Sequence, residues 1–387
     1  MHYYILLIMQ FKNHLFSVIV FLLFTFCFSQ EKRARDYGIQ IGVFETGELN
    51  SITDVEGVSV GHKTIIKGAH IRTGVTAIIP HQKNIFQNKV PAAIYIGNGF
   101  GKLTGYSQVK ELGTIETPII LTNTLSVPIA SESLISYTLE KEGNENLRSV
   151  NPIVGETNDG FLNDIRGRHI KEEDVLEAIK NATSQAVSEG NVGAGTGTIC
   201  FGFKGGIGTA SRKIPESLGG FTVGVLVQSN FGGVLQINGV PVGQELKKFT
   251  FDNAVLNDVD GSCMIIVATD APLNSRNLER VAKRAIMGLA KTGGIASNGS
   301  GDYVISLSVN KENITALAKQ SKFYESRVLK NEALSPIFLA TIEATEEAII
   351  NSLFAAKTLK GNKGQIIESL PKDKVIEIMK KFNRIKK

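Results

Sequence analysis

Residues 260–273 read DGSCMIIVATDAPL, and their apolar run from Met264 to Ala268 predicts a strand that is buried on both faces. Gly261 and Ser262 stand directly before this strand, where a rigid scaffold would hold a serine nucleophile. Because glycine has no Cβ, the Gly261 carbonyl is open to attack. The pair therefore suggests a peptide bond that can cleave itself when the acyl group moves from nitrogen to oxygen.

Such cleavage would leave a new chain that begins at Ser262 and carries both a hydroxyl and a free α-amine. Unperturbed α-amines titrate near ~8, so this amine could act as a general base at neutral pH. The preceding residues 253–260 predict an exposed loop, a kind of segment that tolerates a chain break. By itself, however, a Gly-Ser pair is more typical of an ordinary turn that enters a core strand.

The composition is that of an ordinary globular protein. Of the 387 residues, 42% are hydrophobic and 20% are charged, and 39 are glycine. The net charge of +5 is mild and gives no reason to expect nucleic acid or an anionic surface as a partner. The sequence has no internal repeat and no linker-like break in composition, which favours a single domain.

The first 29 residues predict a secretory signal peptide. Lys12 is the only charged residue among them, and Leu15 to Phe28 is apolar apart from two residues. This run is short for a membrane span, which usually needs ~20 residues. The alternative interpretation is a membrane anchor that is not cleaved. Translation could begin at Met1 or Met9. The mature domain, residues 30–387, is therefore expected in the periplasm or outside the cell.

The cysteines and histidines give no sign of a disulfide framework or a metal site. Cys200 and Cys263 are the two cysteines of the expected mature chain, and they could be free thiols or one bridge. Its four histidines have no i,i+4 pair and no cysteine nearby. No metal or other cofactor is expected.

Hydrophobic periodicity predicts a chain that mixes helices and strands. Helical spacing covers residues 128–142, 172–189, 274–289, 335–353 and 371–382. Runs with β propensity cover residues 58–60, 74–80, 92–96, 118–124, 219–227 and 303–309, and residues 232–243 resemble a hairpin. This mixture implies an α/β or α+β domain with layered sheets.

Two short motifs match well-known patterns but lack their structural context. Residues 57–61, GVSVG, match the G-x-S-x-G nucleophile elbow, yet the β-branched residues that follow do not suit the helix that the elbow requires. Residues 193–197, GAGTG, lack the following helix and the acid of a dinucleotide-binding βαβ unit. We interpret the first motif as a chance match and the second as a tight backbone turn.

Four polar residues could assist a nucleophile at Ser262. Ser300 and Asp302, framed by glycines before a predicted strand, could supply a base and the group that orients it. Asn230 closes a predicted strand and could donate its amide to an oxyanion. Glu156, which we interpret as an acid in a turn, could bind a cationic amine. Taken singly, each of these residues also has an ordinary structural explanation.

Several of these motifs occur together, in the order typical of one family. From about Arg33 to Leu370, the chain resembles the DmpA/BapA self-processing serine aminopeptidases (peptidase family S58), which include L-aminopeptidase/D-esterases and β-peptidyl aminopeptidases. The resemblance rests on ITDVEGVSVGH (52–62), RTGVTAI (72–78), LTNT (121–124), GETNDG (155–160), GAGTG (193–197) and DGS (260–262). It implies a four-layer αββα sandwich of the DmpA/ArgJ type, similar to that of N-terminal-nucleophile hydrolases but with a distinct connectivity.

The resemblance also implies a role for each candidate residue. Two departures stand out: Asp302 is a methylene shorter than the Glu of some members, and Phe161 stands where a tyrosine is expected. Ser262 matches the nucleophile, and Ser300 and Asp302 match the serine and the acid that assist it. Asn230 matches the asparagine that binds the oxyanion, and Glu156 matches the acid that binds the substrate amine.

The activity implied by the resemblance is self-processing followed by hydrolysis. The precursor would be cut between Gly261 and Ser262 into an α-chain, residues 30–261, and a β-chain, residues 262–387, that stay associated. An acyl-enzyme on Ser262 would then release N-terminal L-α-, D- or β-amino acids from peptides, amides or esters, without a cofactor and from a homo-oligomer. Two alternatives remain: an acyl transferase of the ornithine acetyltransferase type, which processes before a threonine, and a non-catalytic secreted binding protein, which would not cleave itself.

Overall fold

The computed structural model describes residues 31–251, 261–317 and 322–385. The predicted signal peptide, residues 1–29, and the predicted exposed loop, residues 253–260, lie outside these ranges. The described residues from Lys32 onward cluster as one compact unit. Within the described ranges, no helix is long and apolar enough to cross a membrane.

A seven-stranded sheet carries the strand predicted from residues 264–268. Its order is β13-β3-β12-β11-β10-β9, with β4 paired to β3 beside this path, and β11 and β12 are its parallel pair. Strand β11 has an interior position and all eight of its residues are buried, as expected for the apolar run. The strands are β3 (Asn88–Gly99), β4 (Thr114–Ile115), β9 (Gly206–Lys213), β10 (Thr222–Asn230), β11 (Ser262–Thr269), β12 (Gly301–Ser308) and β13 (Thr315–Ala316).

A four-stranded sheet, in the order β1-β2-β5-β6, packs face to face against the larger sheet. Its inward side chains, including Leu121 and Ile153, join Leu226, Met264 and Ile266 of the large sheet in one apolar cluster. Full burial of an aliphatic side chain of this size contributes about 1.5–3 kcal/mol. The strands are β1 (Ser59–Lys67), β2 (Ile71–Ile79), β5 (Ile119–Asn123) and β6 (Ile153–Thr157).

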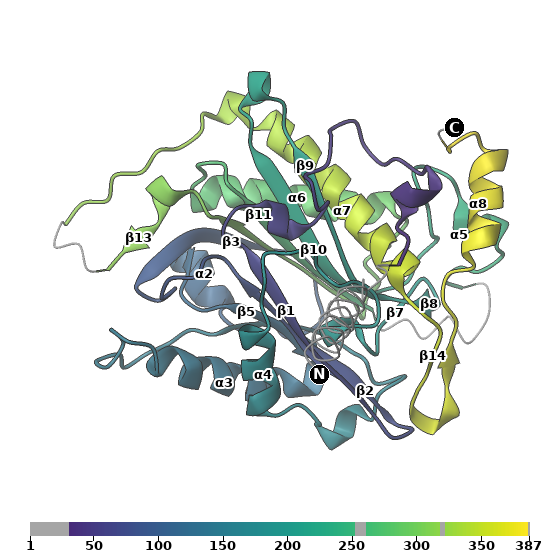
Figure 1. Cartoon of the computed structure of the whole chain (residues 1–387), viewed down its shortest axis with the longest axis horizontal. Coiled ribbons are helices and arrows are strands. Elements are labelled where there is room, and N and C mark those ends of the chain that lie inside the picture. Colours follow the sequence, from purple (N-terminus) through teal and green to yellow (C-terminus); the bar gives the residue numbers. More distant parts are fainter. Residues whose placement is uncertain (1–30, 252–260, 318–321, 386–387) are drawn as a thin grey trace, which may run out of the picture. The chain divides into compact units, whose positions relative to one another are not determined.

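Helices cover the outer face of each sheet, so that the layers run helix, sheet, sheet, helix (Figure 1). On one side α6 and α7 pack on the large sheet, where Cys263, Ile265 and Val267 of β11 belong to the same apolar cluster as both helices. On the other side α3 and α4 pack on the small sheet. The predicted αββα sandwich is therefore confirmed. These helices are α3 (Val127–Leu139), α4 (Glu172–Lys180), α6 (Ser275–Lys291) and α7 (Ser335–Ala355).

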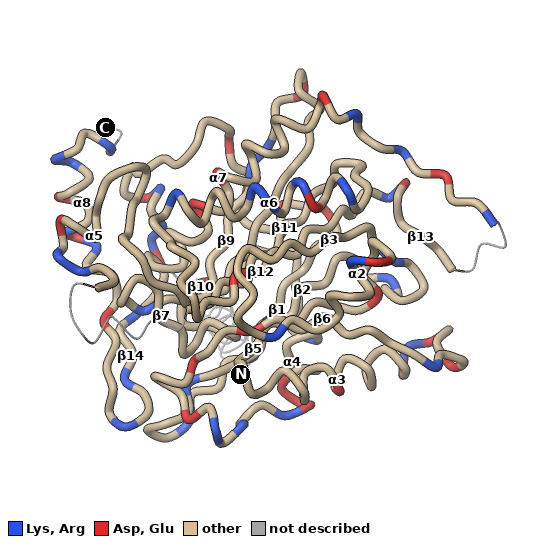
Figure 2. Tube along the Cα trace, turned by 180° about the vertical axis from the view of Figure 1, so that it is seen from behind, with Lys and Arg blue, Asp and Glu red and all other residues tan. Residues whose placement is uncertain are grey.

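Smaller elements surround these layers. Charges of both signs alternate along α8, and α6 carries five basic residues and Glu279 (Figure 2), as is typical of solvated helix faces. Cys200 and Cys263 are buried free thiols, which decides between the two possibilities left open by the sequence. The remaining elements are α2 (Tyr106–Leu112), β7 (Ile199–Cys200), β8 (Phe203–Lys204), α5 (Val242–Glu245), β14 (Leu359–Lys360), β15 (Ile366–Ile367) and α8 (Lys372–Lys381).

Three local predictions are wrong in detail. The helix predicted over residues 172–189 ends at Lys180, because Thr183 pairs with Val60 of β1 through two backbone hydrogen bonds of 3.0 Å. Residues 232–243 contain one internal isolated bridge, Ile237 with Val240, a second bridge from Gly233 to Gly294, and the start of α5 instead of a hairpin. Strand β3 continues to Gly99, three residues beyond the predicted run 92–96, because its last residues still pair with β12.

Candidate active site

Three strand ends meet at Ser262. This serine is the first residue of β11, and its partners across the sheet are Asn230, the last residue of β10, and Gly301, the first residue of β12. Directly opposed residues of antiparallel strands present their side chains to the same face, so the Asn230 side chain lies on the same side of the sheet as the serine. Ser262 is only 5% exposed.

The hydroxyl of Ser262 lies beside the peptide bond that the sequence marks for cleavage. Ser262 Oγ donates to the Gly261 carbonyl oxygen at 2.5 Å. The backbone N–H of Gly301 donates to the same carbonyl oxygen at 3.1 Å and to Ser262 Oγ at 3.3 Å. An N–H aimed at a carbonyl oxygen can stabilise the negative charge that develops there during attack. The uncleaved chain thus holds the candidate nucleophile, the Gly261 carbonyl and a candidate oxyanion donor together.

The side-chain amide of Asn230 is held from two sides. Its Oδ1 accepts from the Ile199 backbone N–H at 2.9 Å, and its Nδ2 donates to the Asn158 carbonyl oxygen at 3.1 Å. An amide nitrogen carries two hydrogens, so the second one remains for an acceptor near Ser262. The position of this donor therefore depends on two backbone segments outside the central strands.

Ser300 and Asp302 flank Gly301 at the start of β12, and both are buried. No described residue lies in hydrogen-bonding geometry with the Ser300 hydroxyl or with either carboxylate oxygen of Asp302. Burial raises the pKa of Asp302 to about 6, although the Ser300 hydroxyl and the Cys263 backbone amide are near enough to oppose this rise. Asp302 is paired with Cys263, so the sheet pleat directs its side chain to the face opposite the Ser262 hydroxyl.

Asn98 supports this site, and the sequence pattern did not indicate it. Its Nδ2 donates to the Ser300 carbonyl oxygen at 2.5 Å and to the Ser297 carbonyl oxygen at 2.9 Å. These bonds fix the turn that leads into β12 and thereby help to place the Gly301 N–H. The available signal was a Gly-Asn-Gly sequence, residues 97–99, directly after the predicted β run 92–96.

Glu156 lies in β6, which corrects the prediction that it sits in a turn, and it is 4% exposed. Its Oε1 accepts from the Lys102 backbone N–H at 3.0 Å, and its Oε2 accepts from the Thr124 hydroxyl. Burial raises the pKa of Glu156, while these two hydrogen bonds oppose the rise. Because a carboxylate has about four acceptor positions, this one has capacity left for a further donor such as an ammonium group.

Tyr303 lies close to both acidic positions, although its sequence context indicated only a strand residue. Its hydroxyl donates to the Gly101 carbonyl oxygen at 3.1 Å. Burial raises the pKa of Tyr303, and the charges of Glu156 and Asp302 add to this effect. Phe161, which stands where the family resemblance leads us to expect a tyrosine, is 45% exposed.

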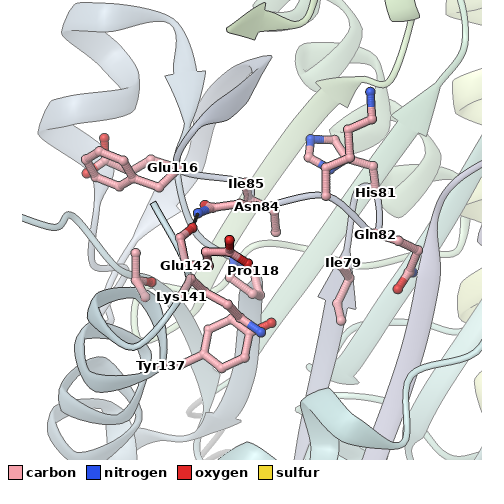
Figure 3. Close-up of a pocket in the computed structure, with 13 residues that line it drawn as sticks. Ile79, His81, Gln82, Asn84, Ile85, Glu116, Pro118, Tyr137, Lys141 and Glu142 are labelled. Carbon is pink, nitrogen blue, oxygen red and sulfur yellow. Dashed lines mark hydrogen bonds between the residues drawn. The ribbon is translucent and has the colours of Figure 1, made fainter. Parts of the chain in front are cut away.

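A separate pocket contains none of these residues in its wall. It lies between the segment that follows β2 and the C-terminal end of α3, and Ile79, His81, Tyr137 and Lys141 line it (Figure 3). Among the described residues, no group of three or more His, Cys, Asp or Glu side chains is placed to hold a metal ion. The site at Ser262 is therefore built by strand ends and is distinct from this pocket.

A buried serine that opens a central strand of an αββα sandwich, directly after a glycine, defines a hydrolase with an N-terminal-nucleophile type of architecture. The chain belongs to peptidase family S58, whose family model matches residues 50–367. It is an aminopeptidase, and the predicted family is confirmed. This assignment favours the peptidase over the acyl transferase and the binding protein that the sequence left open.

Relatives of known structure or activity match almost the whole chain. The β-peptidyl aminopeptidase BapA of Sphingosinicella microcystinivorans is 40% identical over 378 residues, which cover 91% of this chain and 93% of that protein. A solved structure from Pyrococcus horikoshii is 50% identical, with a TM-score of 0.84 over 91% of this chain and 99% of that one. The L-aminopeptidase D-Ala-esterase/amidase of Ochrobactrum anthropi, described as a variant of the Ntn-hydrolase fold, is 34% identical, with a TM-score of 0.84 over 92% and 99%.

Proposed function

We propose that the chain is a self-processing serine aminopeptidase, which cleaves itself between Gly261 and Ser262 and then uses Ser262 to release N-terminal residues. One observation carries this proposal: Ser262 Oγ and the Gly301 N–H both bind the Gly261 carbonyl oxygen in the uncleaved chain. Residues 30–261 would form the α-chain, and residues 262–387 the β-chain.

In the self-cleavage step, Ser262 Oγ attacks the carbonyl carbon of Gly261, and the Gly301 N–H stabilises the oxyanion. The C–N bond then breaks. The acyl group stays on Oγ as an ester, and the hydroxyl proton passes to the departing nitrogen, which becomes the α-amine of Ser262. Water hydrolyses the ester, which leaves a carboxylate on Gly261 and restores the hydroxyl.

In the peptidase reaction, the carboxylate of Glu156 binds the free amino group of the substrate and so selects chain ends. Ser262 Oγ attacks the carbonyl carbon of the N-terminal residue, its proton passes to the new α-amine, and the second amide hydrogen of Asn230 stabilises the oxyanion. Water then releases the acyl group. Asp302 is paired with Cys263 and is therefore better placed to act on the α-amine of Ser262 than on its hydroxyl.

The substrate class follows from the buried carboxylate of Glu156 and from the relatives, whose names specify β-peptidyl, L-aminopeptidase and D-Ala-esterase/amidase activities. We therefore propose peptides, amides and esters with a free amino group on an α- or β-amino acid. A panel of L-, D- and β-aminoacyl p-nitroanilides, each with its N-acetyl counterpart, would define the preference. Only the free amines should be hydrolysed, and equal hydrolysis of the acetylated compounds would remove Glu156 from the proposed role.

The proposal is tested most simply by replacing the nucleophile. Ser262→Ala should abolish hydrolysis of every p-nitroanilide in the panel, because no hydroxyl remains to form the acyl-enzyme. Ser306→Ala is the matched control, since it removes another buried hydroxyl, which donates to the Leu278 carbonyl oxygen at 2.8 Å. The control should keep the wild-type activity, and activity that survives in Ser262→Ala would move the nucleophile elsewhere.

We also propose that the chain is exported and that it self-associates. The apolar segment before Gln30 supports removal of residues 1–29 and a periplasmic or secreted destination. Self-association follows from the family resemblance. N-terminal sequencing of the mature protein should begin near Gln30, and sedimentation should give a mass of more than one copy. An N-terminus at Met1 or Met9 would contradict removal of the segment, and the mass of a single copy would contradict self-association.

A further inference from the structure

Lys204 is a fully buried lysine in β8. Its Nζ donates to the Gly195 carbonyl oxygen at 2.9 Å and to the Gly205 carbonyl oxygen at 2.7 Å, and no described carboxylate forms an ion pair with it. Burying an ammonium group without a paired anion is costly, so a hydrophobic residue of similar volume would be the simpler filling for this space. Packing alone therefore does not explain why a lysine occupies this position.

The two carbonyl groups that Lys204 binds belong to segments that lie on either side of the β7–β8 turn. Gly195 opens the segment that leads through Thr198 into β7, and Gly205 follows β8. Thr198 adds a backbone bond, since its carbonyl oxygen accepts from the Gly205 N–H at 3.1 Å. The Lys204 Nζ therefore bridges the two ends of the segment from residue 195 to residue 205, to which Lys204 itself belongs. We call this closed segment, residues 195–205, the ring.

One residue of this ring binds the side chain of Asn230, the oxyanion donor of the proposed peptidase reaction. Ile199, which pairs with Lys204 across the β7–β8 ladder, donates its N–H to Asn230 Oδ1 at 2.9 Å. The other contact of the Asn230 amide is the carbonyl oxygen of Asn158, next to the buried Asp159. A displacement of β7 would therefore rotate or release the Asn230 amide.

We propose that Lys204 is a positioning residue for Asn230: its ammonium holds Gly195 and Gly205 together, which fixes Ile199 and with it the orientation of the Asn230 amide. This proposal rests on the proposed function, because it assigns a role in the peptidase step. It assigns no role in self-cleavage, where the Gly301 N–H binds the carbonyl oxygen.

The charge of this lysine is sensitive to pH. Burial lowers the pKa of Lys204 to about 7, and the ionised forms of Cys200 and Asp159, which face it, oppose this effect. Burial also raises the pKa of the Cys200 thiol to about 12, so near neutral pH Asp159 is the group of these two that can carry a charge. Burial raises the pKa of Asp159 to about 7; the Thr73 and Asn163 side chains oppose this shift, and the charge of Glu156 adds to it. A neutral amine donates weaker hydrogen bonds than an ammonium group. The ring should therefore loosen as pH rises above neutrality.

The first test compares Lys204→Met with Lys248→Met. Lys248 is the matched control, because its Nζ lies 4.1 Å from the centroid of the Phe203 aromatic ring in β8. It thus contacts the same hairpin but does not bind the carbonyl oxygens of Gly195 and Gly205. Lys204→Met should still cleave into two chains but lose about 10- to 100-fold in kcat at unchanged KM, less than the ~10²–10³-fold expected for loss of the donor itself. The control should keep the wild-type kcat.

The second test uses Lys204→Arg, which stays charged at every accessible pH. Wild-type kcat should decline as pH rises above the Lys204 pKa of about 7, and this alkaline decline should be absent in the Arg variant. A purely structural lysine would leave the pH profile unchanged on substitution. If the Met variant fails to fold, the pH profile of the Arg variant decides the question.

Three results would overturn the assignment. These are a folded Met variant with wild-type kcat, a Met variant that remains uncleaved, and an alkaline decline that persists in the Arg variant. A wild-type chain that neither cleaves itself nor hydrolyses the p-nitroanilides would instead overturn the proposed function, and the positioning role with it.

Discussion

The proposed mechanism uses two oxyanion donors near Ser262, one for self-cleavage and one for peptide hydrolysis. In the uncleaved chain the Gly261 carbonyl oxygen is bound by the Gly301 N–H, while Asn230 donates to the Asn158 carbonyl oxygen. The sequence could suggest Asn230 as a donor because a polar side chain at a strand end is visible there. It could not suggest Gly301, because a backbone N–H has no residue signature and depends on the register between β11 and β12.

Asn230→Ala should separate the two reactions. Self-cleavage should continue, since its oxyanion is bound by Gly301, whereas kcat for peptide hydrolysis should fall by about 10²–10³-fold. Intact mass and p-nitroanilide kinetics measured on the same preparation would check both expectations. A variant that stays in one piece would show that Asn230 also acts during self-cleavage.

Asp302→Asn should stabilise the chain in a pH-dependent way. Burial raises the pKa of Asp302 to about 6, above the ~3.9 of an unfolded aspartate. Its favourable contribution to stability is therefore fully present below about pH 4 and is lost as pH rises through the folded-state pKa. The Asn variant should be more stable than the wild type by about 3 kcal/mol at pH 8 and by less than about 1 kcal/mol at pH 4.

Urea unfolding at both pH values checks this expectation. Both proteins should carry Ser262→Ala, so that single uncleaved chains are compared. A stability difference of equal size at pH 4 and pH 8 would contradict a raised carboxyl pKa. In the background with Ser262 intact, the Asn variant should be slower in hydrolysis, as expected when a functional site trades stability for activity.

Elements whose interior is uniformly apolar were predictable, and elements that depend on distant partners were not. Residues 264–268 predict a doubly buried strand without knowledge of the neighbours, and β11 confirms it. The end of α4 depends instead on Thr183 pairing with Val60, far away in the sequence. Strand β6 was missed for a similar reason, because its glycine and glutamate lack β propensity and are held by the parallel pairing with β5.

The contact between α7 and β9 should depend on Gly208. A Cβ at this position would lie 2.0 Å from the Ala348 carbonyl oxygen and 2.6 Å from Ser352 N, so backbone would have to move. Gly208→Ala should therefore destabilise the chain by about 1–3 kcal/mol in urea unfolding. Gly99→Ala is the control, because its Cβ would meet Ile96 Cγ2 at 3.4 Å, an ordinary contact. Equal stability of the two variants would refute this close approach.

In the whole molecule, the predicted α- and β-chains contribute interleaved strands to one sheet. Strands β12 and β11 follow the predicted cleavage point, and they are flanked by β3 and β10, which precede it. The ordered motifs of the sequence could indicate the family and hence the layers. They could not indicate this interleaving, which arises from pairing between residues up to about two hundred positions apart, such as Asp302 with Asn98.

The two chains should therefore remain together after cleavage. The β3–β12 and β10–β11 ladders both cross from one chain to the other, so separation would expose the apolar core between the sheets. Native gel filtration of the processed protein should give one peak that contains both chains, and denaturant should separate them. Two separate peaks under native conditions would be incompatible with this sheet order.

The central claim is that Ser262 becomes an N-terminus by its own chemistry. Intact mass and N-terminal sequencing of purified wild-type protein and of Ser262→Ala test it most directly. Wild type should give two chains, one of them beginning at Ser262, and the Ala variant should give one uncut chain. A wild-type protein that remains a single chain, or an Ala variant that is still cut after Gly261, would contradict the claim.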